Sequence, residues 1–422
     1  MEYLPLGKAF YKYSESEYKK AYDNRFNASE TIHLDLSIHD DPAFLCQNAE
    51  ILLLCLQINK VDKKIQKLRV AKHGLPGIAL QQFSRRCLID EVVLTNDIEG
   101  VTSTRREIGD ILEKVNESRG EKRFYGLVKR YLLLQSQENI PLNTCEDIRN
   151  LYNTLVLPEV EKDHPENVPD GKIFRKDSVS VNSPSQREIH RGIVPEEKII
   201  EYMEKALRFL HNQEYELLIR VSVFHYLIGY IHPFYDGNGR LSRFISSYML
   251  SQELDPLVGY RLSYTIKENL KKYYESFKIC NDFRNRGDIT PFVISFLEIV
   301  KELMEKLDMA LSGRYAELEH LERVLTRDPF GKDPKYKTLL YLLLQASLFS
   351  DEGISTRELL EIMEISRTTL GERMRKLAPY GYIVCTKNGS AQKYYKLNLE
   401  KLKSVNQSTD NDTGTAEEKE TK

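Results

Sequence analysis

The most constraining stretch of this sequence is an apolar run near its middle, "YELLIRVSVFHYLIGYI". Its periodicity predicts a helix at about 214–230, with apolar residues on every side. A helix at a protein surface keeps a polar stripe, so this helix is expected at the centre of the fold. We therefore predict a mainly α-helical protein built around it.

Amphipathic helical patterns recur on both sides of this run. They cover 49–70, 78–100, 105–116, 121–137, 145–156, 195–212, 241–254, 265–283 and 290–325. Residues 1 to about 41 predict an irregular arm, followed by a helix that starts at "HDDPAF" with Pro42 just inside it. In contrast, "IFRKDSVSVNSPSQREIHRGIV" alternates apolar and polar residues around turn residues, which predicts a small β-hairpin at about 173–192.

Size and composition limit the class of protein. A chain of 422 residues is long enough for two or three domains. The 61 Lys and Arg nearly balance the 63 Asp and Glu. The chain as a whole is therefore not expected to bind nucleic acid or a membrane through its net charge. No apolar run reaches the roughly 18 residues of a membrane span, and the first residues lack a signal-peptide core, so we expect a cytoplasmic protein. Its six scattered cysteines predict reduced, mostly buried thiols.

The segment that follows the central helix, "IHPFYDGNGRLSR", concentrates polar residues and glycines. Pro233 disfavours helical geometry at His232, so the helix should end there. Gly237 and Gly239 allow a tight turn, and a new helix resumes at once. The free backbone N–H groups of that helix start would form a cradle for an anion. The simpler alternative is an ordinary turn between two helices.

The side chains of this segment suit a polyphosphate. Arg240 and Arg243 lie three residues apart at the start of the new helix and can both reach the cradle. Asp236 is a hard oxygen ligand suited to Mg²⁺, which completes its shell with phosphate oxygens and water. A histidine ordinarily titrates near neutrality, so His232 can act as a general base, although a histidine at a helix end is often only a cap.

The segment closely resembles the signature of the Fic family, His-x-Phe-x-(Asp/Glu)-Gly-Asn-Gly-Arg-x-x-Arg. The matching residues are His232, Phe234, Asp236, Gly237, Asn238, Gly239, Arg240 and Arg243. The resemblance implies a Fic helical fold and an enzyme that moves AMP from ATP to a protein hydroxyl. His232 would be the base, Asp236 would bind Mg²⁺, the 237–239 backbone would hold phosphates, and Arg243 would meet the γ-phosphate. A kinase-like branch has alanine and lysine in place of the two glycines, so the glycines here favour AMP transfer.

The resemblance extends to neighbouring segments. "KYYESFKICN" looks like the family's adenine pocket, with Tyr273, Phe277 and Asn281 at matching helical spacing. The alternative is that these rings are helix core, and "DFRNR" lengthens the loop that follows. The hairpin at about 173–192 occupies the place of the family's flap, which holds the target protein by strand addition. Phe234 is expected to anchor the core, and His225 is expected to be a buried structural histidine.

A second, shorter motif lies upstream. "TNDIEG", with Thr95, Glu99 and Gly100, fits the family's inhibitory pattern (Ser/Thr)-x-x-x-Glu-(Gly/Asn) at the end of a predicted helix. The resemblance implies that Glu99 pairs with Arg243 and takes the place of the γ-phosphate. We therefore expect autoinhibition. In some related enzymes the same glutamate positions a water that removes AMP, and this reverse, de-AMPylating reaction stays open.

The C-terminal part carries another pattern. Two helices at about 355–363 and 366–377 precede a ribbon with the turn "KNGS", which resembles a winged helix-turn-helix. The would-be recognition helix carries Ser366, Arg367, Thr368, Thr369 and Arg373, and the wing carries Lys387 and Lys393. Winged helices bind DNA, but they also serve as docking or dimerising modules, and both readings stay open.

These expectations combine into one organisation. The predicted parts are an N-terminal arm and helices carrying the inhibitory motif at 1–110, a Fic catalytic core at 111–328, a winged helix at 335–403 and a disordered tail at 404–422. The expected partners are ATP with Mg²⁺, an unidentified target protein at the flap, the chain itself as a target, DNA, and a second copy in a homodimer. The rival hypothesis from another class is a DNA-binding regulator whose Fic-like core only senses nucleotide.

Overall fold

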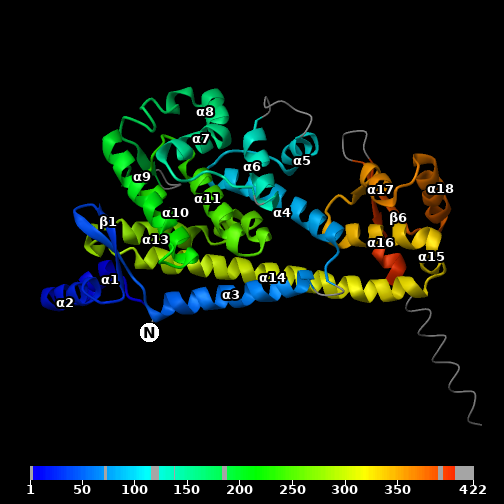
Figure 1. Cartoon of the computed structure of the whole chain (residues 1–422), viewed down its shortest axis with the longest axis horizontal. Helices are drawn as coiled ribbons and strands as arrows, with labels where there is room; N and C mark the ends of the chain where they lie inside the picture. Colours follow the sequence, from blue (N-terminus) through cyan, green and yellow to red (C-terminus); the bar gives the residue numbers. More distant parts are fainter. Residues whose placement is uncertain are drawn as a thin grey trace, which may run out of the picture. The chain divides into compact units, whose positions relative to one another are not determined.

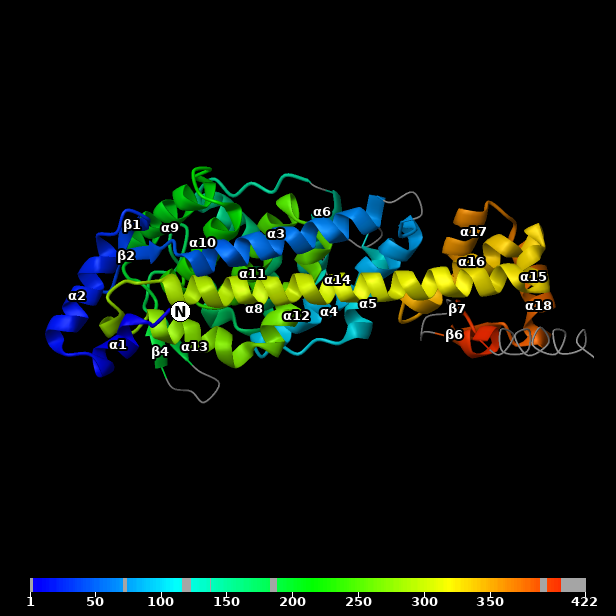
Figure 2. The same ribbon diagram turned by 90° about the horizontal axis from the view of Figure 1, so that it is seen from below.

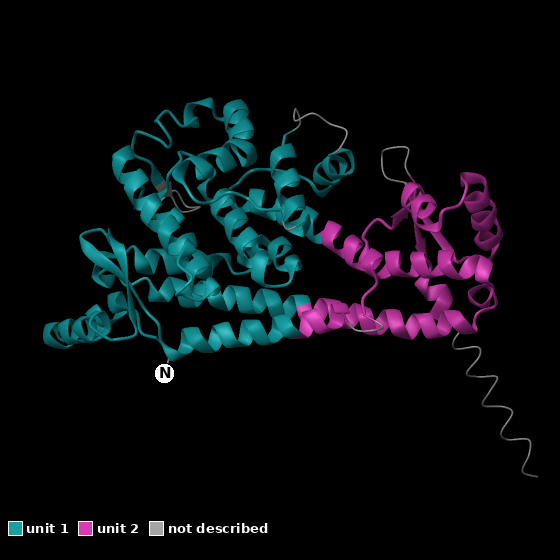
Figure 3. Ribbon diagram, in the orientation of Figure 1, with its two compact units in different colours: residues 1–63, 87–307 teal, residues 64–86, 308–422 magenta. Residues whose placement is uncertain are grey.

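The computed structural model describes residues 3–70, 74–115, 123–136, 138–182, 188–387 and 393–403. The chain is mainly α-helical with a few short strands, as predicted (Figure 1). It divides into two compact units. Unit 1 contains residues 1–63 and 87–307, and unit 2 contains 64–86 and 308–422 (Figure 3). Each unit thus combines segments that are far apart in the sequence.

The long helices α3 (Ala49–Val70), α4 (Gly77–Ile98) and α14 (Thr290–Arg327) contribute to both units. Within unit 1, the first halves of α3 and α14 run side by side in both views (Figures 1 and 2). The smaller helices of unit 1 include α5 (Arg105–Lys114), α6 (Tyr125–Ser136), α7 (Cys145–Leu155), α12 (Leu262–Glu268) and α13 (Leu270–Cys280). No described helix combines the length and apolar content that crossing a membrane requires.

The predicted central helix is α10 (Leu217–Ile231), and its prediction is confirmed. Every side chain of α10 is buried, because apolar residues surround the whole helix. α9 (Glu196–His211) and α11 (Asn238–Glu253) pack directly against it. The loop between α10 and α11 therefore starts from a rigid, fully packed base.

The prediction for the N-terminal segment is wrong. The segment contains α1 (Leu6–Lys12), α2 (Glu15–Phe26), β1 (Thr31–Ile38) and β2 (Asp41–Cys46) in place of an irregular arm. In "TIHLDLSI" polar and apolar residues alternate strictly, and the apolar residues are buried. This two-residue period is the pattern of a β-strand and indicates β1. Pro42 lies in β2, which pairs with β1 in a two-stranded sheet where a missing N–H is tolerated.

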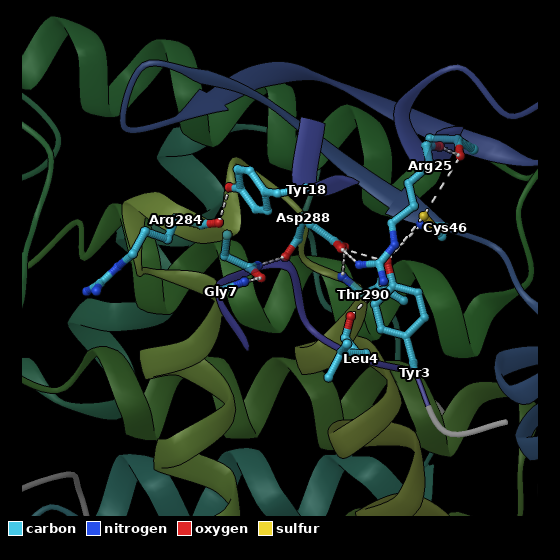
Figure 4. Close-up of polar contacts among 11 residues, drawn as sticks. Tyr3, Leu4, Gly7, Tyr18, Arg25, Cys46, Arg284, Asp288 and Thr290 are labelled. Carbon is cyan, nitrogen blue, oxygen red and sulfur yellow. Dashed lines mark hydrogen bonds and ion pairs between the residues drawn. The ribbon is translucent and has the colours of Figure 1, made fainter. Parts of the chain in front are cut away.

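This N-terminal segment holds the loop that joins α13 to α14. Asp288 in that loop is fully buried and accepts hydrogen bonds from the Tyr3 hydroxyl at 2.6 Å and the Thr290 N–H at 3.0 Å (Figure 4). Arg25 of α2 pairs with the same carboxylate at 3.3 Å. Burial raises the pKa of Asp288, and these partners oppose that rise. Phe44 of β2 also exchanges main-chain hydrogen bonds with Gly287 and Ile289. The loop is therefore anchored from several sides.

The predicted hairpin is present as β3 (Ser180–Asn182) and β4 (Glu188–Arg191), which pair antiparallel. Most of its turn lies outside the described residues. Before the hairpin, the chain forms the short helix α8 (Leu157–Asp163), which has Pro158 in its first turn. Proline at that position is compatible with a helix because its missing N–H is not needed there.

Unit 2 has the predicted order of elements after α14. It contains α15 (Pro329–Lys332), α16 (Pro334–Phe349), α17 (Thr356–Met363) and α18 (Arg367–Leu377). A three-stranded sheet is formed by β5 (Ile354–Ser355), β7 (Lys393–Leu397) and β6 (Ile383–Lys387), in that spatial order. Its membership of the winged-helix class stays a prediction. The turn of the ribbon and the predicted tail at 404–422 lie outside the described residues.

Candidate active site

The loop between α10 and α11 makes the predicted turn into a helix start. His232 ends α10 in the left-handed conformation, with φ 53° and ψ 63°. Gly237 precedes α11 with φ 78°, a conformation that favours glycine, and no described side chain caps the helix. The first-turn N–H groups of α11 are therefore available for an anion, where the helix dipole also favours negative charge.

Two residues of the motif stabilise this loop from inside. Asn238 is buried, and its side chain both accepts from the Phe234 N–H at 3.0 Å and donates to the Phe234 carbonyl at 2.8 Å. The Phe234 ring is fully buried and stacks on Tyr152 with centroids 3.7 Å apart. The Asn238 side chain is thus committed to the loop, and only its main chain can meet a ligand.

Arg240 faces the protein interior. It is 1% exposed, with Nη1 3.4 Å from Glu159 Oε2 and Nη2 3.8 Å from Asp236 Oδ1. Burial raises the pKa of Glu159 to about 7, against the lowering effect of Arg240. Asp236 is 29% exposed, so its carboxylate still reaches solvent. Arg240 therefore supports the loop from behind, whereas Asp236 remains open to a cation.

Arg243 is paired with the upstream motif. Its Nη2 lies 2.8 Å from Glu99 Oε1, and Nη2 also donates to the Thr95 carbonyl at 2.9 Å. Its Nε donates to Thr95 Oγ1 at 2.9 Å. Burial acts to lower the pKa of Arg243, but the charge of Glu99, its hydrogen bond and the nearby Tyr273 and Tyr274 together raise the pKa overall. The Thr95 hydroxyl and the Glu99 carboxylate of the upstream motif therefore both bind Arg243.

The Glu99 carboxylate lies over the start of α11. A Cβ placed on Gly239 would lie 2.1 Å from Glu99 Oε1 and 2.9 Å from Arg243 Nη1. Glycine is thus required for this close approach. α4 ends just before Glu99, because Gly100 adopts φ 75° and Val101 donates its N–H back to the Asn96 carbonyl. A negative charge therefore already sits in the predicted anion cradle.

Two further acidic residues attach the C-terminal half of α4 to α12. Glu91 is fully buried and accepts from the N–H groups of Ser263, at 2.9 Å, and Tyr264, at 3.4 Å, at the start of α12. Asp97 pairs with Lys267 of α12 at 2.7 Å. The end of α4, which directly precedes Glu99, is therefore held in place independently of Arg243.

His232 is partly exposed and positioned by its main chain. Its N–H donates to the Ile228 carbonyl at 2.9 Å, and its carbonyl accepts from Arg175 Nε at 2.8 Å. Its Nδ1 atom is nevertheless buried, and it has no hydrogen-bond partner among the described residues. Burial, followed by the charge of Arg175, lowers the pKa of His232 to about 4. The ring is thus neutral at pH 7, the form that can accept a proton.

The three predicted adenine-pocket residues lie along α13 and just after it, in different surroundings. Tyr273 is buried, and its hydroxyl is hydrogen-bonded to His225 Nε2 at 2.8 Å. Phe277 is partly exposed and packs on Phe292 and Tyr226. Asn281 accepts from the Tyr226 hydroxyl at 2.8 Å and is also partly exposed. Phe277 and Asn281 therefore offer surface to a ligand, whereas Tyr273 is packed like core.

His225 is fully buried, as expected for a structural histidine. Burial, followed by the charge of Arg243, lowers its pKa to about 3. The unfolded chain protonates this ring below about pH 6.5, so its contribution to stability is lost as the pH falls. Between about pH 6.5 and 5, we expect the parent protein to lose about 2 kcal/mol more unfolding free energy than His225→Gln. Urea unfolding followed by circular dichroism measures this difference, and equal losses in both proteins would contradict it.

The part of the chain that contains the candidate site matches a known protein family. The family model for the Fic/DOC family matches residues 142–250, which contain α7, the hairpin and the whole segment from His232 to Arg243. This part of the chain is therefore similar to a Fic domain. The Fic domain thus includes the cradle and the catalytic candidates, whereas Glu99 lies outside the matched region.

Several curated relatives carry the name "Protein adenylyltransferase Fic". Those of Drosophila yakuba and Drosophila melanogaster are each 25% identical over 244 residues, which cover 55% of this chain and 45% of the relative. The chain thus spans less than half the length of these relatives. A solved structure of a Fic family protein from Desulfovibrio desulfuricans G20 aligns with 18% identity and a TM-score of 0.49, covering 83% of this chain and 96% of that one.

The structure brings Thr95, Glu99, Gly239 and Arg243 of the predicted set into one place. Three residues around the Fic domain's site were missed at the sequence level: Glu91, Glu159 and Arg175. Each is a charged residue buried by segments distant in sequence, and no local pattern marks it. The only available signal was that Arg175 directly follows the apolar pair Ile173 and Phe174.

Phe234 should be the main apolar anchor of the loop in the Fic domain. It is fully buried between Tyr152 and Phe174, so Phe234→Ala is expected to cost about 3–5 kcal/mol of unfolding free energy. Phe234→Leu should cost clearly less, since it keeps most of the volume. Urea unfolding measures both, and an alanine variant as stable as the parent would contradict the anchoring role.

Proposed function

We propose that this chain transfers AMP from ATP to a hydroxyl side chain of a target protein or of itself, and that Glu99 inhibits this reaction. The observation that carries the proposal is the Glu99 carboxylate, which lies 2.8 Å from Arg243 and directly over Gly239 at the start of α11. A terminal phosphate bound in the cradle would need the same arginine and the same space. Nucleotide and Glu99 therefore compete for one site.

The roles of the protein groups follow from their contacts. The neutral His232 ring takes the proton of the attacking hydroxyl. The hydroxyl oxygen bonds to the α-phosphorus of ATP, the bond to the bridging oxygen of the β-phosphate breaks, and pyrophosphate leaves. The N–H groups at the start of α11 stabilise the charge on the phosphates. The product is a phosphodiester between AMP and the target side chain.

The residues present also fit a magnesium ion. The protein would supply the carboxylate of Asp236, which is partly exposed beside the start of α11. Magnesium commonly takes one or two carboxylates and fills the rest of its shell with phosphate oxygens and water. When bound, it would neutralise phosphate charge beside the cradle.

Other parts of the domain would bind the two reactants. The base of the nucleotide would lie against the partly exposed Phe277 and Asn281, and their spacing of one helical turn suits a flat ring. The β3–β4 hairpin would hold the target by adding a strand through main-chain hydrogen bonds. This mode selects an extended segment and places its hydroxyl near His232.

Mass spectrometry tests the proposal directly. The Glu99→Gly protein is incubated with ATP and Mg²⁺, and intact masses are recorded for the protein and for proteins of a cell extract. The expected result is addition of AMP that depends on His232. Loss of AMP from a previously modified protein would indicate the reverse reaction. Absence of any adduct, together with no binding of ATP, would refute the proposal.

A second candidate activity, DNA binding, is favoured by the surface of α18. Arg367, Arg375 and Lys376 are exposed on this helix, and Ser366 caps its start. We expect the full-length chain to bind a random DNA duplex with an affinity that falls with salt. Arg367→Ala should reduce the slope of log affinity against log salt by about 1.

Fluorescence anisotropy with a labelled duplex measures this slope. Arg357→Ala is the matched control, because Arg357 lies on α17, is exposed and pairs with Glu361 at 3.4 Å. If both variants change the slope equally, or if the parent protein does not bind the duplex at low salt, DNA binding by α18 would be contradicted. A docking role would then be the remaining hypothesis for unit 2.

A further inference from the structure

Arg175 is a buried cation with unusual partners. It is fully buried, and no described acidic side chain lies within ion-pair distance of it. Its guanidinium donates only to main-chain carbonyls. The acceptors are His232 at 2.8 Å from Nε, Asp177 at 2.5 Å from Nη1, and Ile193 at 2.9 Å and Ile231 at 3.3 Å from Nη2. Burial lowers its pKa to about 10, so the side chain remains charged at neutral pH.

These hydrogen bonds join two parts of the candidate site. Asp177 and Ile193 flank the β3–β4 hairpin, whereas Ile231 and His232 end α10. Main-chain bonds run in parallel, from the Ile193 N–H to the Ile231 carbonyl at 3.1 Å and from the Arg175 N–H to the Pro233 carbonyl at 3.2 Å. Arg175 therefore lies where the base of the hairpin meets the end of the central helix.

Arg175 and His232 both pack closely against Gly192, which follows the hairpin. A Cβ on Gly192 would lie 2.3 Å from Arg175 Nη2 and 3.1 Å from His232 Cβ. Glycine at this position lets the hairpin approach both side chains at once. A movement of Arg175 would thus be transmitted directly to His232.

The conformation of His232 needs such support. Its φ of 53° is left-handed, a conformation that is strained for a residue with a Cβ. The hydrogen bond from Arg175 Nε holds the His232 carbonyl in the orientation that this conformation requires. The direction of the imidazole follows from the main chain, because its own Nδ1 has no described partner to orient it.

We propose that Arg175 is a positioning residue for His232, which sets the ring of the general base relative to the cradle and couples it to the target-binding hairpin. This inference rests on the proposed AMP transfer. Arg175 touches no reacting atom, so its loss should affect the chemical step while the nucleotide still binds. The alternative is a purely structural role, in which any loss of stability would account for lost activity.

Kinetics in the Glu99→Gly background separate these roles. Arg175→Met is expected to lower kcat of AMP transfer about 100-fold, the scale for misplacing a catalytic group, while KM for ATP stays within about threefold. Arg175→Lys, which keeps the charge and some of the hydrogen bonds, should recover part of the loss. Gly192→Ala keeps the arginine but displaces it, and should lower kcat in the same way.

Arg149→Met is the matched control. Arg149 also donates to a carbonyl at the base of this segment, that of Ile173, at 2.7 Å, and has no bond to His232. It should lower the melting temperature with kcat nearly unchanged. The acid limb of the kcat profile should move to higher pH in Arg175→Met, because a cation near His232 is removed. The other charged or titratable groups that face this ring are His190 and, in the parent chain, Glu99.

The outcomes separate the inference from the proposed function. A kcat of Arg175→Met within about threefold of its background, or an equal loss in Arg149→Met, would overturn the inference. If the background protein itself transfers no AMP, the proposed function fails, and Arg175 is then tested by NMR. In that case the His232 ring signals should shift in Arg175→Met and not in Arg149→Met, and unchanged signals would overturn the inference.

Discussion

His232→Ala in the Glu99→Gly background is expected to lower AMP transfer about 1,000-fold, within the range for loss of a general base. The physical reason is the state of this ring. Burial and the charge of Arg175 lower the His232 pKa to about 4, so the ring is neutral and can accept the proton of the attacking hydroxyl at pH 7. Initial rates with ATP labelled at the α-phosphate measure the loss.

Two controls accompany this prediction. His164→Ala removes an exposed histidine that pairs with Glu166, and it should leave the rate unchanged. Calorimetry should show that His232→Ala still binds ATP, because the N–H groups of α11 and Arg243 are intact. A variant that keeps more than about a tenth of the rate would show that another group removes the proton.

Glu99→Gly is expected to raise the rate of AMP transfer about 10- to 100-fold over the parent chain. A hydrogen bond to a charged group contributes about 1.5–3 kcal/mol, and each 1.4 kcal/mol changes an equilibrium about tenfold. Removing the Glu99 carboxylate frees Arg243 and the space above Gly239. Affinity for ATP should rise together with the rate, since both depend on the same arginine.

Asp97→Gly is the matched control for this prediction. It introduces the same flexible residue two positions away and removes a carboxylate that pairs with Lys267 and not with Arg243. Glu99→Gln, which keeps the size of the side chain but not its charge, should activate the protein partially. If Asp97→Gly activates as strongly as Glu99→Gly, loosening of the end of α4 would be the cause, and the pairing of Glu99 with Arg243 would not be.

The anchoring of α4 limits how the proposed inhibition by Glu99 could be relieved. Glu91 holds the helix to α12 two turns before Glu99, and Asp97 holds it again near its end. At Gly100, in contrast, no atom of the described residues lies within 4 Å of the Cβ position, and the helix has already ended. Release of Arg243 therefore requires only movement of the Glu99 side chain or of the short segment around it, since the rest of α4 stays attached.

The residues of the candidate site could be predicted from the sequence to the extent that they form local motifs. The motif from His232 to Arg243 could be recognised because histidine, aspartate, glycines and arginines lie within a few residues of one another. The predicted inhibitory motif could be recognised for the same reason, and its Glu99 does pair with Arg243 in the structure. The N-terminal hairpin was missed because its alternation was outweighed by the apparent helix start at Pro42.

The sequence by itself determined the central helix, since an apolar surface on all sides can only be buried, and it determined the kinds of groups around the turn that follows. Only the tertiary structure decided which of these groups face the cradle. The Arg240 side chain points inward and pairs with Glu159. The Asn238 side chain is hydrogen-bonded to the main chain of Phe234, and Arg175 donates to the His232 carbonyl although it lies 57 positions earlier in the sequence. Such contacts join segments distant along the chain, and their partners are set by packing, which no local pattern records.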